Sequence, residues 1–190
     1  MSVDDAIRTR RSHRSFARDP VSLAALATVL QRSYGTHGQG DGTIARAVPS
    51  GGGLHPLDVY VLQFSGGALP EGVYHYHAGA HALQRVGVRC DRRELEAASI
   101  YPDIIASATV LLALVADMPR TRAKYGERAY RLALLEAGHV SQNLYLVARA
   151  LGLGIVALDG FYDDRLHAIL DVDGVAQIAL MLFAMGRLDV

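Results

Sequence analysis

The sequence contains little cysteine and carries no excess of charge of either sign. One cysteine, Cys90, among 190 residues excludes an internal disulfide framework and a metal site built from several cysteines. Nineteen Lys and Arg residues balance nineteen Asp and Glu residues, so the basic excess that binds nucleic acid or an anionic membrane is absent. The cysteine usage favours a reducing, cytoplasmic setting.

Long hydrophobic segments are also missing. The first twenty residues are charged and contain no apolar stretch, so no secretory signal is visible. The longest apolar run, residues 104–116, includes Ser107 and Thr109 and is shorter than the roughly 20 residues of a membrane-spanning helix. The apolar share of 51% is ample for a core, so we expect one soluble domain over residues 1–190.

Periodicity and capping residues predict interleaved helices and strands. Ser2 and Asp5 form a capping-box pattern, and Ser22 and Gly35 mark the ends of a second helix. Residues 109–117 form a continuous apolar run, typical of a central strand covered on both faces. The other expected elements are strands at 58–63, 73–76, 83–86, 155–158 and 178–185, with 73–76 and 83–86 as a hairpin, and a short helix capped by Asp163.

The longest predicted helix, residues 127–151, is apolar nearly all the way round. Leu134 and Leu144 lie on one face, and Leu135 and Val140 make much of the rest apolar. One small domain could hardly bury such a helix alone, so we expect part of it to face a second subunit. Together with the strands, this favours an α+β layer structure.

The first candidate site is the basic segment 10–15, with the sequence RRSHRS. Guanidinium forks and hydroxyl groups suit phosphate oxygens, which accept charge-assisted hydrogen bonds. The alternative is a solvated basic helix end, where cations complement the negative end of the helix dipole. For this segment alone the alternative is favoured, because short basic clusters are weak motifs.

The second candidate is residues 49–56, with the sequence PSGGGLHP, which leads directly into a predicted strand. Consecutive glycines allow backbone amides to approach a flat or anionic ligand closely. Residues 36–53 show no periodicity, so a flexible surface loop is an equally good interpretation. The sequence contains no Walker lysine, no GxGxxG after a strand and no GxSxG, which argues against a P-loop, a Rossmann site and a serine nucleophile.

The third candidate is residues 124–131, with the sequence KYGERAYR, which enters the long helix. Lysine and tyrosine become acid–base catalysts only when burial or neighbouring charge changes their titration. His139 and Asn143 lie four residues apart on one helix face. They can be satisfied polar groups at a packed interface, and for His139 alone this interpretation is favoured.

Two further groups are given structural roles. His75, His77 and His81 lie on the predicted hairpin, and no carboxylate in the local sequence completes a metal site, so no metal is expected. Cys90 lies between Arg89 and Asp91, and nothing marks it as an activated thiol.

Taken in order, these segments resemble the nitroreductase-like flavoprotein family, and within it the SagB-type dehydrogenase branch. The resembling segments span nearly the whole chain and are residues 10–16, 49–56, 72–77, 124–131, 136–139, 142–145 and 160–164. The resemblance implies an FMN-binding α+β fold with a central, mostly antiparallel sheet flanked by helices. It also implies an intertwined homodimer with two flavins at the subunit interface.

The resemblance further implies roles for individual residues. The flavin phosphate would be held by Arg10, Ser12 and Arg14 together with Arg187, and the other subunit would contribute the segment around Ser50. A backbone N–H near Gly160 would approach the reactive nitrogen of the flavin and favour the reduced cofactor. The implied cofactor-binding residues are Arg10, Arg11, Ser12, Arg14, Pro49, Ser50, Gly51, Gly52, Leu54, Gln142, Leu158, Asp159, Gly160 and Arg187.

The SagB-type branch is associated with the oxidation of thiazolines and oxazolines to thiazoles and oxazoles in modified or nonribosomal peptides. In this resemblance Lys124 and Tyr125 are the catalytic pair: Tyr125, made more acidic by Lys124, would remove the ring α-proton while the flavin takes a hydride. Oxygen would reoxidise the flavin. Many members of the branch carry extra N-terminal sequence that engages the peptide or partner enzymes, whereas this sequence begins at the flavin-binding segment. We therefore expect either a substrate that is not a peptide, or a separate cyclodehydratase or synthetase partner that delivers a peptide.

Two other functions remain open at this point. One is an NAD(P)H-dependent nitro- or quinone reductase on the same fold. The other is a flavin-binding protein without turnover, which serves as a scaffold in a synthetase complex.

Overall fold

A computed structural model describes residues 1–38, 44–87 and 89–188 of the chain. The helices are α1 (Val3–Thr9), α2 (Leu23–Tyr34), α3 (Arg92–Ala97), α4 (Pro102–Ser107), α5 (Met118–Tyr125), α6 (Arg128–Ala150) and α7 (Asp163–Leu170), with a 3₁₀ turn at Gly51–Gly53. The strands are β1 (Thr36–Gly38), β2 (Ile44–Arg46), β3 (Leu57–Gln63), β4 (Gly72–His77), β5 (Ala82–Gly87), β6 (Val110–Asp117), β7 (Leu153–Leu158) and β8 (Gln177–Arg187).

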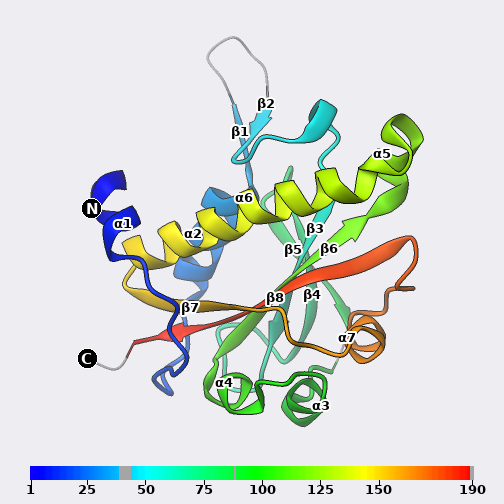
Figure 1. Cartoon of the computed structure of the whole chain (residues 1–190). Helices are drawn as coiled ribbons and strands as arrows, with labels where there is room; N and C mark the ends of the chain where they lie inside the picture. Colours follow the sequence, from blue (N-terminus) through cyan, green and yellow to red (C-terminus); the bar gives the residue numbers. More distant parts are fainter. Residues whose placement is uncertain (39–43, 88, 189–190) are drawn as a thin grey trace.

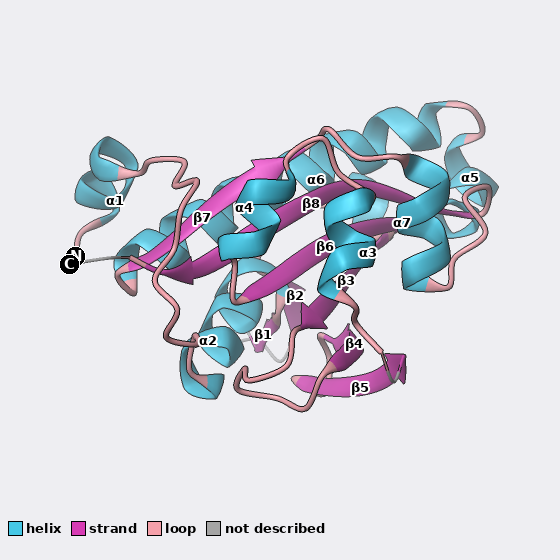
Figure 2. Cartoon of the chain, turned by 90° about the horizontal axis from the view of Figure 1, so that it is seen from below, coloured by secondary structure: helices cyan, strands magenta, loops and turns pink. Residues whose placement is uncertain are grey.

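The main sheet of the described residues has six strands in the order β5-β4-β3-β6-β8-β7, and each neighbouring pair is antiparallel. Helices α2 and α6 cover one face of this sheet, whereas α3, α4 and α7 lie on the other, as Figures 1 and 2 show. The fold is therefore α+β with helices on both faces of an antiparallel sheet, as predicted.

Strand β6 lies at the centre of the sheet, between β3 and β8. Successive side chains of a strand point to opposite faces, and both faces are covered here. Leu112 and Leu114 enter the apolar cluster beneath α2 and α6, whereas Leu111 and Ala113 enter the cluster beneath α3, α4 and α7. The continuous apolar run of the sequence thus corresponds to burial on both sides, which confirms the prediction.

Helix α6 packs along the sheet through small residues. Ala133, Ala137 and Ala148 are buried, together with Val140 and Leu144. Alanine brings the helix axis close to the strands because its side chain is a single methyl group. The opposite side is open: Tyr130, Leu134 and Leu135 are 48%, 44% and 57% exposed.

The local capping predictions are largely confirmed. Ser2 and Asp5 form a reciprocal capping box at α1, and the Ser22 hydroxyl caps α2, which ends before Gly35. Asp163 was expected to cap α7, but this was wrong: the N-cap is Tyr162, and Asp163 is the first helical residue. Its carboxylate lies in the first turn, where negative charge complements the helix dipole.

The structure also corrects the prediction of one loop over residues 36–53. Strands β1 and β2 pair with each other, with Thr36 opposite Arg46, and the 3₁₀ turn follows. Strands of three residues are too short to show a period of two. Residues 39–43 of the expected loop lie outside the described residues.

Helices α3, α4 and α5 were not predicted, because each is only six to eight residues long. Their start signals are nevertheless present in the sequence. The Asp91 side chain accepts a hydrogen bond from Arg93 N–H at the start of α3, and α4 and α5 have Pro102 and Pro119 in their first turns.

The central position of β6 makes its apolar side chains the strongest contributors to stability. Replacing Leu112, which is fully buried, with alanine should lower the free energy of unfolding by about 3 kcal/mol, because the change leaves a cavity on the α6 side. Urea denaturation followed by circular dichroism measures this. The control is Val175→Ala, which trims a side chain that is 71% exposed; an equal loss in both variants would contradict the assignment of the core.

Candidate functional site

The basic N-terminal segment lies against the outer strands of the sheet. His13 N–H donates to Ile155 O at 3.0 Å, and Ala17 N–H donates to Arg187 O at 2.9 Å. These two bonds attach the segment to β7 and to the end of β8. The alternative, a basic helix end, holds for the first two residues, because Arg10 is the C-cap of α1 and Arg11 donates to Arg8 O in its last turn. The rest of the segment is fixed on the sheet.

Two paired glycines make room for this segment. Gly154 of β7 lies opposite Gly186 of β8. A Cβ on Gly186 would lie 2.6 Å from Phe16 Cβ, and a Cβ on Gly154 would lie 3.1 Å from His13 Cβ. The two missing side chains therefore let the basic segment approach the sheet closely, with Phe16 buried over it.

Ser12 is held by Tyr145 of α6. The two hydroxyl oxygens are 3.1 Å apart, and Tyr145 Oη also accepts a hydrogen bond from Ala157 N–H at 2.9 Å. The Arg10 guanidinium lies 5.2 Å from the centre of the Tyr145 ring, a distance at which a cation–π interaction operates. Tyr145 thus organises this end of the site, a role that was not predicted from the sequence.

The other cations of this region differ in their surroundings. Arg14 and Arg187 are exposed, and Arg187 Nη1 lies 3.8 Å from Asp19 Oδ2. Arg11 turns back on its own backbone, where its Nη1 donates to Arg8 O and Arg10 O. The structure thus keeps Arg10, Ser12 and Arg14 on one extended segment that is bonded to Arg187.

Residues 50–55, which we call the glycine loop, form a compact turn. Ser50 Oγ accepts a hydrogen bond from His55 N–H at 2.9 Å, and Ser50 O accepts one from Gly53 N–H at 3.1 Å. Gly52 has a φ of +67°, which a residue with a Cβ adopts only at a cost. The loop is therefore closed by its own hydrogen bonds and requires glycine at its tip.

The glycine loop touches the predicted catalytic pair within the same chain. A Cβ on Gly52 would lie 2.5 Å from Tyr125 Oη and 3.0 Å from Lys124 Nζ, and a Cβ on Gly51 would lie 3.2 Å from the side chain of Leu132. Lys124 Nζ lies 5.3 Å from the centre of the Tyr125 ring. The second and third candidate segments therefore form one cluster at the N-terminal end of α6.

A buried carboxylate fixes the helix that carries this pair. Asp58 of β3 forms two hydrogen bonds with Arg120 of α5, at 2.9 and 3.1 Å, and Arg120 also pairs with Asp117. His75 Nε2 lies 3.1 Å from Asp58 Oδ1. Burial acts to raise the pKa of Asp58, but the hydrogen bonds from His75 and Arg120 outweigh it and leave the pKa below its ordinary value.

The turn after β7 is held by the connection between α3 and α4. Leu158 is buried and Asp159 is exposed. Gly160 O accepts hydrogen bonds from Ile100 N–H at 2.9 Å and from Ser99 Oγ at 3.2 Å. A Cβ on Gly160 would lie 2.4 Å from the Ile100 side chain, so the turn packs too closely for any larger residue.

The remaining predicted cofactor residues are Pro49, Leu54 and Gln142. Pro49 is exposed directly before the glycine loop, and Leu54 is half-buried within it. Gln142 is exposed on α6, one turn before Tyr145. Asn143 points inward and donates to Ala47 O at 3.1 Å, as expected of a satisfied polar group, whereas His139 is exposed.

The two clusters lie toward opposite ends of α6. Leu132 touches the glycine loop and Tyr145 touches the basic segment, which places the two contacts about 20 Å apart along the helix axis. Figure 1 shows α1 beside the C-terminal end of α6 and α5 at the other end. The predicted phosphate residues and the predicted catalytic pair are therefore not brought together within one chain.

The sequence profile described as "Nitroreductase family" matches residues 7–187. The chain belongs to the nitroreductase family. Members of this family are flavoprotein oxidoreductases, so the chain is an oxidoreductase of this class, and its α+β architecture is the nitroreductase fold.

Three curated relatives are similar in sequence. A nitroreductase-family protein of Methanocaldococcus jannaschii is 34% identical over 98% of this chain and 91% of its own length. The microcin B17-processing protein of Escherichia coli is 31% identical over 82% of this chain, and the trifolitoxin-processing protein TfxB of Rhizobium leguminosarum is 27% identical over 87%. The chain spans 58% and 44% of these two proteins, and the similarity to them supports the SagB-type branch.

Solved structures show the same fold. A nitroreductase-family protein of Ralstonia eutropha superposes with a TM-score of 0.85 at 24% identity and covers all of this chain and 84% of its own. A chain of the Escherichia coli microcin synthetase complex gives 0.80 at 23% identity, over 97% of this chain and 73% of its own. A Desulfovibrio desulfuricans protein in complex with FMN gives 0.69 at 23%, over 100% and 88%.

Histidine and cysteine take structural roles in this nitroreductase-family chain. Within residues 1–38, 44–87 and 89–188, no group of three or more His, Cys, Asp or Glu side chains could hold a metal ion. We predicted that no carboxylate accompanies the hairpin histidines. This was wrong, because Asp58 bonds to His75 across the sheet. Cys90 is buried, which raises its pKa to about 12 and leaves it unreactive.

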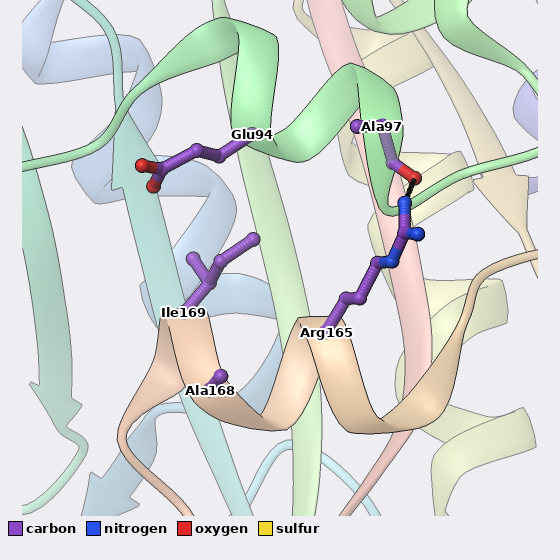
Figure 3. Close-up of a pocket in the computed structure, with 5 residues that line it drawn as sticks. All are labelled: Glu94, Ala97, Arg165, Ala168 and Ile169. Carbon is purple, nitrogen blue, oxygen red and sulfur yellow. Dashed lines mark hydrogen bonds between the residues drawn. The ribbon is translucent and has the colours of Figure 1, made fainter.

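An open pocket of about 350 Å³ lies between α3 and α7, away from both clusters. Its walls are formed by Glu94, Ala97, Arg165, Ala168 and Ile169. Figure 3 shows the Arg165 guanidinium donating to Ala97 O, a bond of 2.6 Å that joins the two helices. The pocket contains none of the predicted site residues.

Among the described helices, none is long and apolar enough to cross a membrane.

The bond between Asp58 and Arg120 predicts a specific dependence of stability on pH. Since the pKa of Asp58 is lowered in the folded state, its stabilisation is complete above the unfolded value near 4 and is lost as the pH falls through the folded value. Asp58→Asn should cost about 2 kcal/mol at pH 7, and the difference from the wild type should shrink toward pH 3. Urea unfolding at both pH values measures this.

The matched control is Asp19→Asn, which alters a carboxylate outside the helices that is 75% exposed, where an ion pair contributes little. It should leave the free energy of unfolding nearly unchanged at both pH values. A difference between wild type and Asp58→Asn that does not depend on pH would show that Asp58 is not stabilised as a carboxylate.

Proposed function

We propose that the protein is an FMN-dependent dehydrogenase that oxidises azoline rings to azoles and works as a homodimer. The observation that carries this proposal is the contact of the glycine loop with Lys124 and Tyr125, about 20 Å along α6 from the basic segment. In a dimer, each flavin would be held by the basic segment of one subunit and reached by the Lys124–Tyr125 cluster of the other.

The residues at the basic segment fit the phosphate of FMN. Arg10, Ser12 and Arg14 lie on one extended segment bonded to Arg187 O, and the exposed guanidinium groups of Arg14 and Arg187 can donate charge-assisted bonds. At the other cluster, Gly52 packs directly on the catalytic pair, because a Cβ there would lie 2.5 Å from Tyr125 Oη and 3.0 Å from Lys124 Nζ; the loop thus holds the two side chains in place. A nitroreductase-family neighbour was solved in complex with FMN.

The open face of α6 supports the homodimer. Tyr130, Leu134 and Leu135 are about half exposed in one chain, and large exposed apolar patches mark protein–protein interfaces. Gly138 and Gln142 continue the same exposed face. A second α6 packed here would bury the face and bring the two ends of α6 from different subunits together.

The roles of the catalytic pair follow from their chemistry. Dehydrogenation of an azoline removes one proton and one hydride from adjacent ring atoms and leaves a C=C bond. Tyr125 is proposed to act as a phenolate whose Oη accepts the proton and becomes a neutral hydroxyl, and the Lys124 ammonium to stabilise the negative charge of that phenolate before the transfer. FMN, when bound, supplies the hydride acceptor, with dioxygen as the terminal oxidant.

The relatives support a substrate within a peptide. The similar proteins of Escherichia coli and Rhizobium leguminosarum are named for the processing of microcin B17 and trifolitoxin, and one fold neighbour is part of a microcin synthetase complex. We propose an azoline-containing peptide as the substrate of this chain as well, with a cyclodehydratase or synthetase as the partner.

The proposed binding of the FMN phosphate by Arg10 and Arg14 can be tested by comparing FMN with riboflavin, which lacks the phosphate. Arg10→Gln together with Arg14→Gln should weaken FMN binding at least about tenfold, because charge-assisted bonds to the phosphate are lost, and should change riboflavin binding little. Quenching of flavin fluorescence measures both affinities. The control is Arg93→Gln on α3, an exposed cation away from the basic segment; equal losses for FMN and riboflavin would refute the phosphate assignment.

The catalytic pair can be tested by removing it. Lys124→Ala with Tyr125→Ala should leave FMN bound and lower azole formation by about a hundredfold or more, the size of an acid–base contribution. The assay follows a synthetic thiazoline peptide by mass spectrometry for the loss of two hydrogens. Tyr74→Phe, which removes a hydroxyl that donates to Pro70 O, is the control; unchanged turnover in the double variant would remove this mechanism.

Complementation separates a shared site from a site within one chain. At an FMN concentration that saturates the wild type but lies well below the weakened Kd of the double Arg10 and Arg14 variant, this variant and Tyr125→Phe should each have little activity alone. Mixed dimers should regain activity, because one of their two sites combines an intact basic segment with an intact Tyr125. No recovery on mixing would contradict the shared site.

A nitroreductase activity is the second candidate, favoured by the relative of Methanocaldococcus jannaschii, which matches 98% of this chain. Anaerobic mixing with NADPH distinguishes the two. Rapid bleaching of the flavin would favour the reductase, whereas indifference to NADPH together with azole formation would favour the dehydrogenase. Flavin binding without either reaction would indicate a scaffold.

A further inference from the structure

A buried carboxylate lies directly behind the glycine loop. Glu136 of α6 is 2% exposed. Its Oε1 accepts a hydrogen bond from Tyr34 Oη at 3.1 Å, and its Oε2 has no partner. None of the predicted catalytic or cofactor-binding residues bonds to it, so its retention in the interior requires another explanation.

His55, the last residue of the glycine loop, faces this carboxylate. Its Nδ1 lies 3.7 Å from Glu136 Oε1 and is buried without a hydrogen-bond partner. Hydrogen bonds between nitrogen and oxygen span about 2.7–3.2 Å, and an unpartnered buried polar group costs about 1–3 kcal/mol. A displacement of the imidazole by less than about 1 Å would bring Nδ1 within hydrogen-bond distance of Glu136 Oε1 and satisfy the buried Nδ1, so closing the pair is favoured.

The constrained backbone of the glycine loop connects His55 to the residue that packs on Lys124 and Tyr125. His55 has a φ of +47°, a strained conformation for a non-glycine residue, and its N–H is fixed to Ser50 Oγ. These constraints leave the loop little freedom between His55 and Gly52. Gly52 in turn packs on Tyr125 Oη and Lys124 Nζ.

The surroundings keep the imidazole suited to this contact. Burial lowers the pKa of His55, and Glu136 opposes that effect without overcoming it, so His55 is neutral at pH 7 and can carry its proton on Nδ1. The other charged groups near the pair are Arg46, which lies over the Tyr34 ring at 4.5 Å, and Arg120, whose Nη1 lies 3.5 Å from His55 O. Arg46 also acts to lower the pKa of His55 and so disfavours its protonated form.

We propose that Glu136 and His55 form a clamp, in which the buried carboxylate accepts the Nδ1 proton of His55 and holds the glycine loop against Lys124 and Tyr125. Both are positioning residues, because they act on the reacting groups through the loop. This inference rests on the proposed function, since it assigns the clamp to proton transfer at Tyr125.

The chain offers a matched set of variants. His55→Asn places an amide donor near the position of Nδ1, and asparagine tolerates positive φ. His55→Gly keeps the backbone conformation and removes the donor. Glu136→Gln keeps the acceptor oxygen, whereas Glu136→Leu removes it. If Glu136→Leu fails to fold, the two His55 variants still separate the donor from the backbone.

Hydrogen exchange of the cofactor-free protein tests the clamp itself. Amides of residues 50–55 should exchange at least about tenfold faster in His55→Gly and Glu136→Leu than in wild type, whereas His55→Asn and Glu136→Gln should stay within about threefold. Amides of β6 serve as the internal control and should be unchanged. Loop exchange in His55→Gly that equals wild type, or loop exchange in His55→Asn that equals His55→Gly, would overturn the clamp.

Turnover of the thiazoline peptide tests what the clamp does. His55→Gly should lower kcat about tenfold with KM within about threefold, because the reacting groups lose their alignment while the substrate still binds, and His55→Asn should restore most of kcat. Equal kcat in wild type and His55→Gly would overturn the positioning role. A wild type without azole formation would instead remove the proposed function, and the exchange measurement would still decide the clamp.

Discussion

The packing of α6 along the antiparallel sheet is the constraint on which the rest of the structure depends. Small side chains such as Ala133 and Ala137 bring the helix close to the strands, and its length separates the glycine loop from the basic segment by about 20 Å. The helix is also the shared wall of both clusters, since Glu136 and Tyr145 belong to it. A site that needs both clusters would therefore be assembled from two chains, and we propose the exposed apolar face of α6 as the surface between them.

Missing side chains are as important here as the functional groups. The Gly154 and Gly186 pair lets Phe16 and the basic segment lie on the sheet, and Gly52 lets the loop lie on Tyr125. In each case a Cβ would occupy the space that a neighbouring segment needs. Polar contacts then hold the neighbouring segments in place. Asp58 binds Arg120 of α5, and Tyr145 bonds to Ser12 of the basic segment.

The sequence predicted the elements whose periodicity is long enough to read, such as the helix at 127–151 and the strand at 109–117. It also indicated the residue types of both clusters. The pairs between distant segments could not be predicted: Asp58 with Arg120, and Glu136 with His55, are separated by more than sixty residues. A partial signal existed, because Arg120 precedes Lys124 by one helical turn. Tyr145 was present in a resembling segment, but only the fold places it against Ser12.

A site shared between two chains has a thermodynamic consequence. If FMN binds the dimer and not the separate chains, flavin and dimerisation stabilise each other, and the apparent affinity for flavin rises with protein concentration. The exposed side chains of Leu134 and Leu135 then have two roles, since burying them releases apolar surface from water and completes the flavin site. The buried Glu136 adds a cost to each chain, and in the proposed clamp a hydrogen bond from His55 offsets part of it. In the proposed dimer, stability, assembly and alignment of the predicted catalytic pair would thus all depend on the two sides of α6, one packed on the sheet and the loop, the other exposed and able to contact a second copy.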